Sequence, residues 1–139
     1  MKHTISIAFL AAAGLLTIGN ASAQTYGVQA KIPFDFTVGN MQLPAGNYTI
    51  TASSSNVVVV RNQQLPRIVT LAMVMPDDTQ TTKQEHLIFH KYGDQYFLSQ
   101  IVCPGHALDS NLPTSRREKR AQQQEASIQN VDEVYLALK

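Results

Sequence analysis

Short runs of alternating apolar and polar residues, separated by turn-forming residues, dominate the chain after its first two dozen positions. Ile32, Phe34, Phe36 and Val38 alternate with less apolar neighbours. This alternation predicts a half-buried strand over residues 32–38, placed near a sheet edge because Pro33 has no N–H to donate.

Three more strands are expected before the middle of the chain. Residues 48–52 resume the alternation, and residues 67–75 form a further apolar run after Pro66. Residues 57–60 are four consecutive valines, which is typical of a strand covered on both faces.

A β-hairpin is the clearest local prediction. Residues 86–92 and 95–102 are apolar-rich and are separated only by Gly93 and Asp94. A two-residue loop that begins with Gly favours a type II′ turn. That turn places Phe89 opposite Leu98 and His90 opposite Phe97.

A single helix and a final strand complete the expected elements. Ser115 followed three residues later by Glu118 resembles a capping box, which predicts a helix over about residues 116–127. That segment has almost no apolar face, so we expect a solvated helix. Alternation returns over about residues 131–138. Roughly seven strands at this spacing predict an all-β fold, a small antiparallel sandwich or barrel, formed as one domain by residues 24–139.

The first 23 residues have the pattern of a secretory signal peptide. Lys2 and His3 precede an apolar run over residues 5–18, and Ala21-Ser22-Ala23 follows. The run is shorter than the roughly 20 residues that span a bilayer. We therefore expect cleavage after Ala23, a periplasmic or extracellular location, and no membrane span in the mature chain.

Composition narrows the classes of partner. The 139 residues carry 11 Lys+Arg and 10 Asp+Glu, a formal charge of +1, which argues against nucleic acid as a partner. One cysteine, Cys103, excludes an intramolecular disulfide. In an oxidising compartment this thiol is either buried or used in a disulfide-linked dimer.

Two segments resemble a known group of proteins. They are Ile32-Pro-Phe-Asp-Phe-Thr-Val-Gly-Asn40 with Leu43-Pro-Ala-Gly-Asn-Tyr48, and Phe89-His-Lys-Tyr-Gly-Asp-Gln-Tyr-Phe-Leu98 with Leu112-Pro-Thr-Ser-Arg-Arg-Glu118. Together they are similar to a group of small exported bacterial β-proteins. The resemblance implies an exported β-domain and assigns it no mechanism.

Candidate metal ligands are few. Met73 and Met75 could offer two thioethers to Cu(I), and Cys103 with His106 could form half of a metal site. The favoured interpretation is that the two methionines fill gaps in the core and that Cys103 is a small buried residue. We therefore expect no metal and no cofactor. His86 and His90 would lie about 13 Å apart along a strand, too far to share an ion.

Catalytic signals are weak as well. The chain has no G-x-S-x-G motif, and the basic run 116–120 is best explained as a solvated helix face. The sequence thus favours an exported, non-catalytic binding or envelope-associated module whose partner is an unknown protein or envelope component. Ligands are expected at loops 77–84 and 104–114. The alternatives are a periplasmic copper-type metal-binding protein and a small hydrolase.

Overall fold

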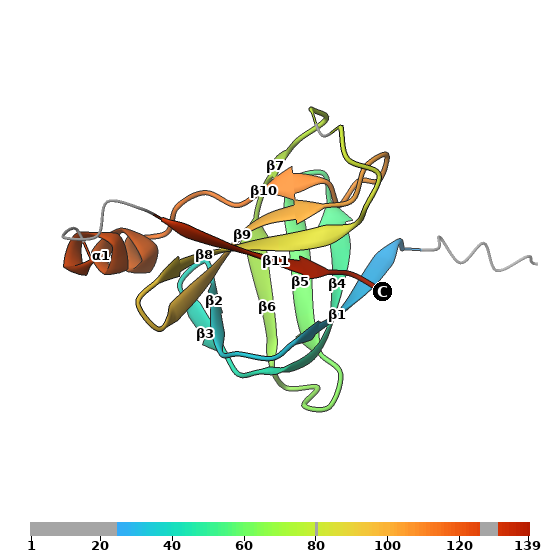
Figure 1. The fold of residues 1–139 in the computed structure, drawn as a ribbon. Coiled ribbons are helices and arrows are strands. Elements are labelled where there is room, and N and C mark those ends of the chain that lie inside the picture. Colours follow the sequence, from blue (N-terminus) through green and yellow to red (C-terminus); the bar gives the residue numbers. More distant parts are fainter. Residues whose placement is uncertain (1–24, 80, 126–130) are drawn as a thin grey trace, which may run out of the picture.

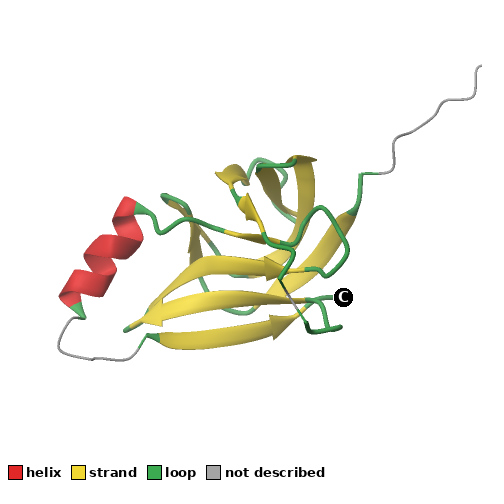
Figure 2. Ribbon diagram, turned by 90° about the horizontal axis from the view of Figure 1, so that it is seen from above, coloured by secondary structure: helices red, strands yellow, loops and turns green. Residues whose placement is uncertain are grey.

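The fold is all-β, as the alternating pattern predicts. The computed structural model describes residues 25–79, 81–125 and 131–139. Two sheets curl into a half-barrel, with one helix beside it in this part of the chain (Figures 1 and 2). The predicted signal peptide lies outside the described residues.

The first sheet is antiparallel and has four strands in the order β1-β4-β5-β6. Their bounds are β1 (Gly27–Ile32), β4 (Gly46–Ser54), β5 (Val57–Asn62) and β6 (Val69–Met73). Buried and exposed residues alternate along β1 and β6, so one face of each strand contributes to the core.

The second sheet follows the order β11-β8-β9-β10-β7. These strands are β7 (Met75–Pro76), β8 (His86–Tyr92), β9 (Gln95–Val102), β10 (Ser110–Asn111) and β11 (Asp132–Ala137). A small hairpin of β2 (Phe36–Val38) and β3 (Met41–Leu43) joins this sheet through a parallel contact between Thr37 and Phe97.

Aromatic rings connect the two sheets in a shared core. Phe36 packs edge-to-face on Tyr48 of the first sheet and on Phe89 of the second, with ring centroids 5.1 and 5.6 Å apart. All three side chains are at most 1% exposed. This arrangement is the preferred geometry for aromatic pairs and fixes the β2–β3 hairpin between the sheets.

The sheets also meet along the backbone on two sides. The amide of Lys139, just after β11, donates to the carbonyl of Gln29 in β1 (3.1 Å). On the other side the chain passes from β6 through Val74 into β7, and so changes sheets. Between these junctions β6 remains the last strand of its sheet.

The predicted β8–β9 hairpin is confirmed, register included. Phe89 pairs with Leu98 and His90 with Phe97, and Tyr92 pairs with Gln95 across the two-residue loop. Gly93 has φ +58°, as the first position of a type II′ turn requires.

Two strand predictions are wrong. Residues 32–38 are not one strand: β1 ends at Ile32 and β2 begins at Phe36 in the other sheet. Pro33 interrupts the ladder, and alternation of side chains alone does not reveal a change of sheet. The valine run is not covered on both faces either, because Val58 and Val60 are buried whereas Val57 and Val59 are only half-buried.

The number of strands also exceeds the prediction. The described chain has eleven strands where the sequence suggested about seven. The prediction did not include β1 as a separate strand, nor the short strands β3, β7 and β10. Strands of two or three residues carry too few positions for an alternating pattern to be recognised.

Helix α1 (Arg116–Gln124) begins where predicted, with Ser115 as the N-cap whose hydroxyl accepts from the Glu118 amide (3.1 Å). Its expected end near residue 127 falls outside the described residues. The expectation of a solvated helix is wrong at two positions, because Glu118 and Ala121 are buried at 4% and 2% exposure. None of the described helical residues forms a segment long and apolar enough to cross a membrane.

Candidate functional site

Hydrogen bonds among four polar side chains link the hairpin to the helix. His90 Nδ1 lies 2.8 Å from Glu118 Oε1, and His90 Nε2 lies 3.0 Å from Ser99 Oγ. The Tyr92 hydroxyl donates to the same Glu118 oxygen over 3.2 Å. We call His90, Tyr92, Ser99 and Glu118 the polar network.

The hairpin geometry places these side chains under the helix. His90, Tyr92 and Phe97 share the face of the hairpin that α1 covers, where Tyr92 and Phe97 pack with Ala121. Ser99 lies on the same face because it is two residues beyond Phe97 on β9. The register shifts by one residue between Leu98 and Gln100, so Ser99 is a β-bulge residue with no pairing partner of its own on β8. The network therefore joins both strands of the hairpin to the helix.

The hydrogen-bond partners of His90 determine which of its ring nitrogens carries a proton. A carboxylate only accepts hydrogen bonds, so His90 Nδ1–H donates to Glu118 and, in the neutral ring, Ser99 Oγ–H donates to Nε2. The hydrogen bond to Glu118 raises the pKa of His90, burial opposes this, and the charges of Glu118 and Glu133 raise it further. Burial, with the charge and hydrogen bond of Glu118, raises the pKa of Tyr92 to about 12.

The order Ser99–His90–Glu118 matches the connectivity of a serine hydrolase triad, with the hydroxyl on one ring nitrogen and a carboxylate on the other. A triad also needs donors for an oxyanion and a cleft for the substrate. Two grooves, of about 520 Å³ beside β6 and about 610 Å³ beside β11, are lined by residues outside this network. The same bonds also have a structural role, since they satisfy the buried Glu118 carboxylate.

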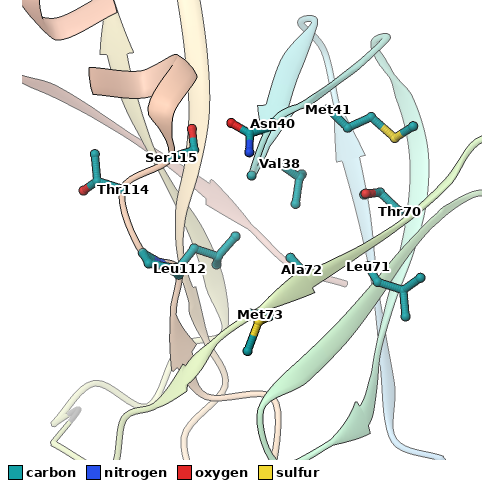
Figure 3. A pocket seen from close by; sticks show the side chains of 12 residues that line it. Val38, Asn40, Met41, Thr70, Leu71, Ala72, Met73, Leu112, Thr114 and Ser115 are labelled. Atoms are coloured by element: carbon teal, nitrogen blue, oxygen red, sulfur yellow. The ribbon is translucent and has the colours of Figure 1, made fainter. Parts of the chain in front are cut away.

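A groove of about 520 Å³ opens beside β6, and we call it the seam. Figure 3 shows side chains of three segments around it: the β2–β3 turn (residues 38–41), β6 (residues 70–73) and the link from β10 to α1 (residues 112–115). Three of its apolar side chains are conspicuously exposed, namely Met41 (49%), Leu71 (65%) and Met73 (72%).

The free edge of β6 borders the seam. The Val74 amide donates to the Asn56 carbonyl (2.8 Å), which marks Val74 as a position that bonds toward β5. Bonding direction alternates along an antiparallel strand, so the N–H and C=O groups of Leu71 and Met73 point away from β5. Among residues 25–79, 81–125 and 131–139, no strand pairs with this side of β6, so these backbone groups face outward.

The predicted metal candidates lie in different surroundings, the two methionines exposed and Cys103 buried. Met73 ends β6 and Met75 begins β7, and both are exposed, so the prediction that they fill the core is wrong. Cys103 is fully buried, and burial, followed by the charges of Glu85 and Asp109, raises its pKa to about 12.

The side chain of His106 contacts Tyr26 and Glu85. Its ring stacks on Tyr26 with centroids 3.8 Å apart, and its Nε2 lies 3.8 Å from Glu85 Oε1. His86 and His90 likewise have separate partners, because His86 Nδ1 lies 2.9 Å from the Gln84 carbonyl. Within residues 25–79, 81–125 and 131–139 no three His, Cys, Asp or Glu side chains are placed to hold a metal ion.

The two loops expected to carry recognition differ. Loop 104–114 contributes residues 112–114 to the seam. In loop 77–84, Asp77 accepts hydrogen bonds from Gln100 and Asn111, which attach its start to the second sheet. Sequence reasoning missed Ser99 and the burial of Glu118, and only the capping position of Glu118 hinted at a defined side-chain position.

Comparison with known proteins adds no relative. No protein-family model, no curated protein and no solved structure matches the chain.

Proposed function

We propose that this chain is an exported, non-catalytic β-domain that acts as a binding module, with the seam holding an extended segment of a cell-envelope protein. The observation that carries the proposal is the unpaired edge of β6 with Leu71 and Met73 exposed along it. Export rests on the signal-peptide pattern of residues 1–23.

The chemistry of the edge favours a polypeptide partner. Proteins usually protect an edge strand with charges, prolines or bulges. Along β6 the outward-bonding positions are instead Val69, Leu71 and Met73, and Pro66 and Pro76 lie beyond the strand. An added strand would bond to the free backbone groups and cover the apolar side chains at the same time.

Site-specific photocrosslinking tests the proposal. The full-length chain, with a photoreactive benzoyl-phenylalanine at Met73, is produced in its own organism and irradiated in intact cells. Leu65 serves as the matched control, because it is also an exposed apolar residue (52%) but lies outside the seam. We expect an envelope protein crosslinked from position 73 and not from position 65, with peptide mapping of an extended segment. The crosslinked chain should begin at Gln24.

Three outcomes would overturn parts of the proposal. Equal crosslinking from both positions would remove the seam as the site. A crosslink to a second copy would replace the envelope partner with self-association. If the chain recovered from the cells still carried residues 1–23, the proposed export by signal-peptide cleavage would be wrong.

A small hydrolase is the second candidate, favoured by the Ser99–His90–Glu118 geometry. In this alternative Ser99 Oγ bonds to the acyl carbon of an ester and passes its proton to His90 Nε2. The proton then leaves with the alcohol, and water releases the acyl group by the reverse transfers. A fluorophosphonate probe that labels the wild type but not Ser99→Ala would establish this candidate and overturn the non-catalytic proposal. If the probe labels neither protein, the role of the polar network is structural.

A further inference from the structure

Three arginines form a basic hollow next to the seam. Asn40, Arg116, Arg117 and Arg120 line a depression of about 460 Å³, and Asn40 also lines the seam. Ser115, the next residue before Arg116, is part of the seam lining. The apolar groove therefore continues directly into a positively charged surface.

These guanidinium groups are available to an external anion. Arg117 Nη2 donates to Gln42 Oε1 over 2.9 Å, which holds this side chain against β3. In the described part of the chain no carboxylate lies within 4.0 Å of Arg116, Arg117 or Arg120. Glu118, their closest acidic neighbour in sequence, turns its carboxylate the other way, to His90.

The backbone at the N-terminus of α1 also favours an anionic ligand. Arg116, Arg117 and Arg120 lie in the first five residues of α1, at the end where free amides and the helix dipole favour negative charge. Arginine is also the side chain best suited to bidentate binding of carboxylates. A ligand bound here would thus combine an apolar part, along β6, with an anionic part.

We propose that the partner segment is acidic: an extended polypeptide that adds to β6 and places Asp or Glu side chains, or its terminal carboxylate, on Arg116, Arg117 and Arg120. This inference rests on the proposed binding function. An anionic lipid also combines apolar and anionic parts, but it would leave the backbone groups of β6 unpaired. The free edge therefore favours a peptide.

An array of random peptides of about eight residues, long enough to cover β6, tests the inference with the folded mature chain as the probe. Selected peptides should have apolar residues at alternate positions and Asp or Glu at one end. The best peptide is then synthesised with its acids intact or replaced by the matching amides. The acidic form should bind at least about tenfold more tightly, and this advantage should shrink at high salt.

Variants separate the two proposals. Arg116→Gln with Arg120→Gln should remove the advantage of the acidic peptide, whereas Lys31→Gln with Lys119→Gln, which lowers the net charge equally, should not. If the selected peptides were not enriched in Asp or Glu, the inference of an acidic partner would be wrong, and the seam would remain the proposed binding site. If the peptides bound the Leu71→Asp variant as tightly as the wild type, the seam would not be the binding site. Binding to phosphatidylglycerol vesicles with no peptide selected would assign the site to lipid and overturn both.

Discussion

His90 Nδ1 lies 2.8 Å from Glu118 Oε1, although 28 positions separate the two residues in the chain. This contact attaches α1 to the β8–β9 hairpin at the point where Glu118 is almost fully buried. Burying a carboxylate is costly unless hydrogen bonds compensate for the lost water, and here His90 and Tyr92 both donate to Glu118 Oε1. The position of the helix, and with it one wall of the seam, therefore depends on this pair.

Replacing Glu118 should lower the free energy of unfolding. Glu118→Gln keeps the shape but loses the charge-assisted bond to His90, for an expected cost of about 1 kcal/mol. Glu118→Ala should cost about 3 kcal/mol, because it removes both hydrogen bonds and leaves His90 without its partner. Urea unfolding followed by circular dichroism measures both changes. Asp132→Asn, at an exposed carboxylate in β11, is the control and should change little. Equal losses in all three variants would contradict the role of the network.

Stability should depend on pH through His90. Its pKa in the folded chain is raised above the ordinary 6.5, mainly by the hydrogen bond to Glu118, so folding favours the protonated ring. This contribution is fully present below about pH 6.5 and is lost as pH rises through the folded pKa. Urea midpoints across pH 5.5 to about 9 should fall in the wild type, and this fall should be smaller in His90→Gln. An identical fall in both proteins would assign the dependence to other groups.

The helix and hairpin illustrate how far local sequence information reaches. The register of β8 and β9 follows from Gly93-Asp94, and the start of α1 follows from Ser115, because both are set by residues close in the chain. The burial of Glu118 was not predictable in this way. It depends on a helix packing against a hairpin that is distant in the chain, and such a contact leaves no local pattern.

The candidate binding surface shows the same limit. The apolar run over residues 67–75 correctly indicates a strand, and residues 112–114 lie in a loop chosen for recognition. The sequence does not show that β6 ends its sheet, because strand order depends on pairings between distant segments. Met73 was therefore expected in the core, whereas at 72% exposure it is more exposed than Leu71 and Met41, the other exposed apolar residues of the seam.

Replacing Asp109 should stabilise the protein. Asp109 is 6% exposed, and within the described residues its Oδ1 has no hydrogen-bond partner. Burial, followed by the charge of Asp77, raises its pKa, so ionisation at neutral pH opposes folding. Asp109→Asn should raise the free energy of unfolding by about 1 kcal/mol at pH 7.

The pH dependence of this gain separates charge from packing. A raised pKa means that the stability of the protonated form is present below the ordinary value of 3.8 and is lost as pH rises through the folded pKa. The advantage of Asp109→Asn should therefore shrink in a urea series taken from pH 7 toward pH 4. Asp94→Asn, in the exposed hairpin turn, should give no such trend. A gain that stays constant with pH would show that charge is not its cause.

Cys103 should be unreactive in the folded chain and should not link two folded copies. Its side chain is fully buried, and burial, followed by the charges of Glu85 and Asp109, raises its pKa to about 12. At pH 8 only about one such thiol in ten thousand is ionised, and the thiolate is the reactive form. Ellman's reagent should therefore modify Cys103 only as fast as the domain opens, and rapidly in 6 M guanidinium chloride. A Leu65→Cys variant should add one thiol that reacts at once, because Leu65 is 52% exposed. Rapid reaction of the wild type, or a dimer that disappears on reduction, would show that Cys103 reaches the surface. It would also restore the disulfide-linked dimer that the single cysteine allows.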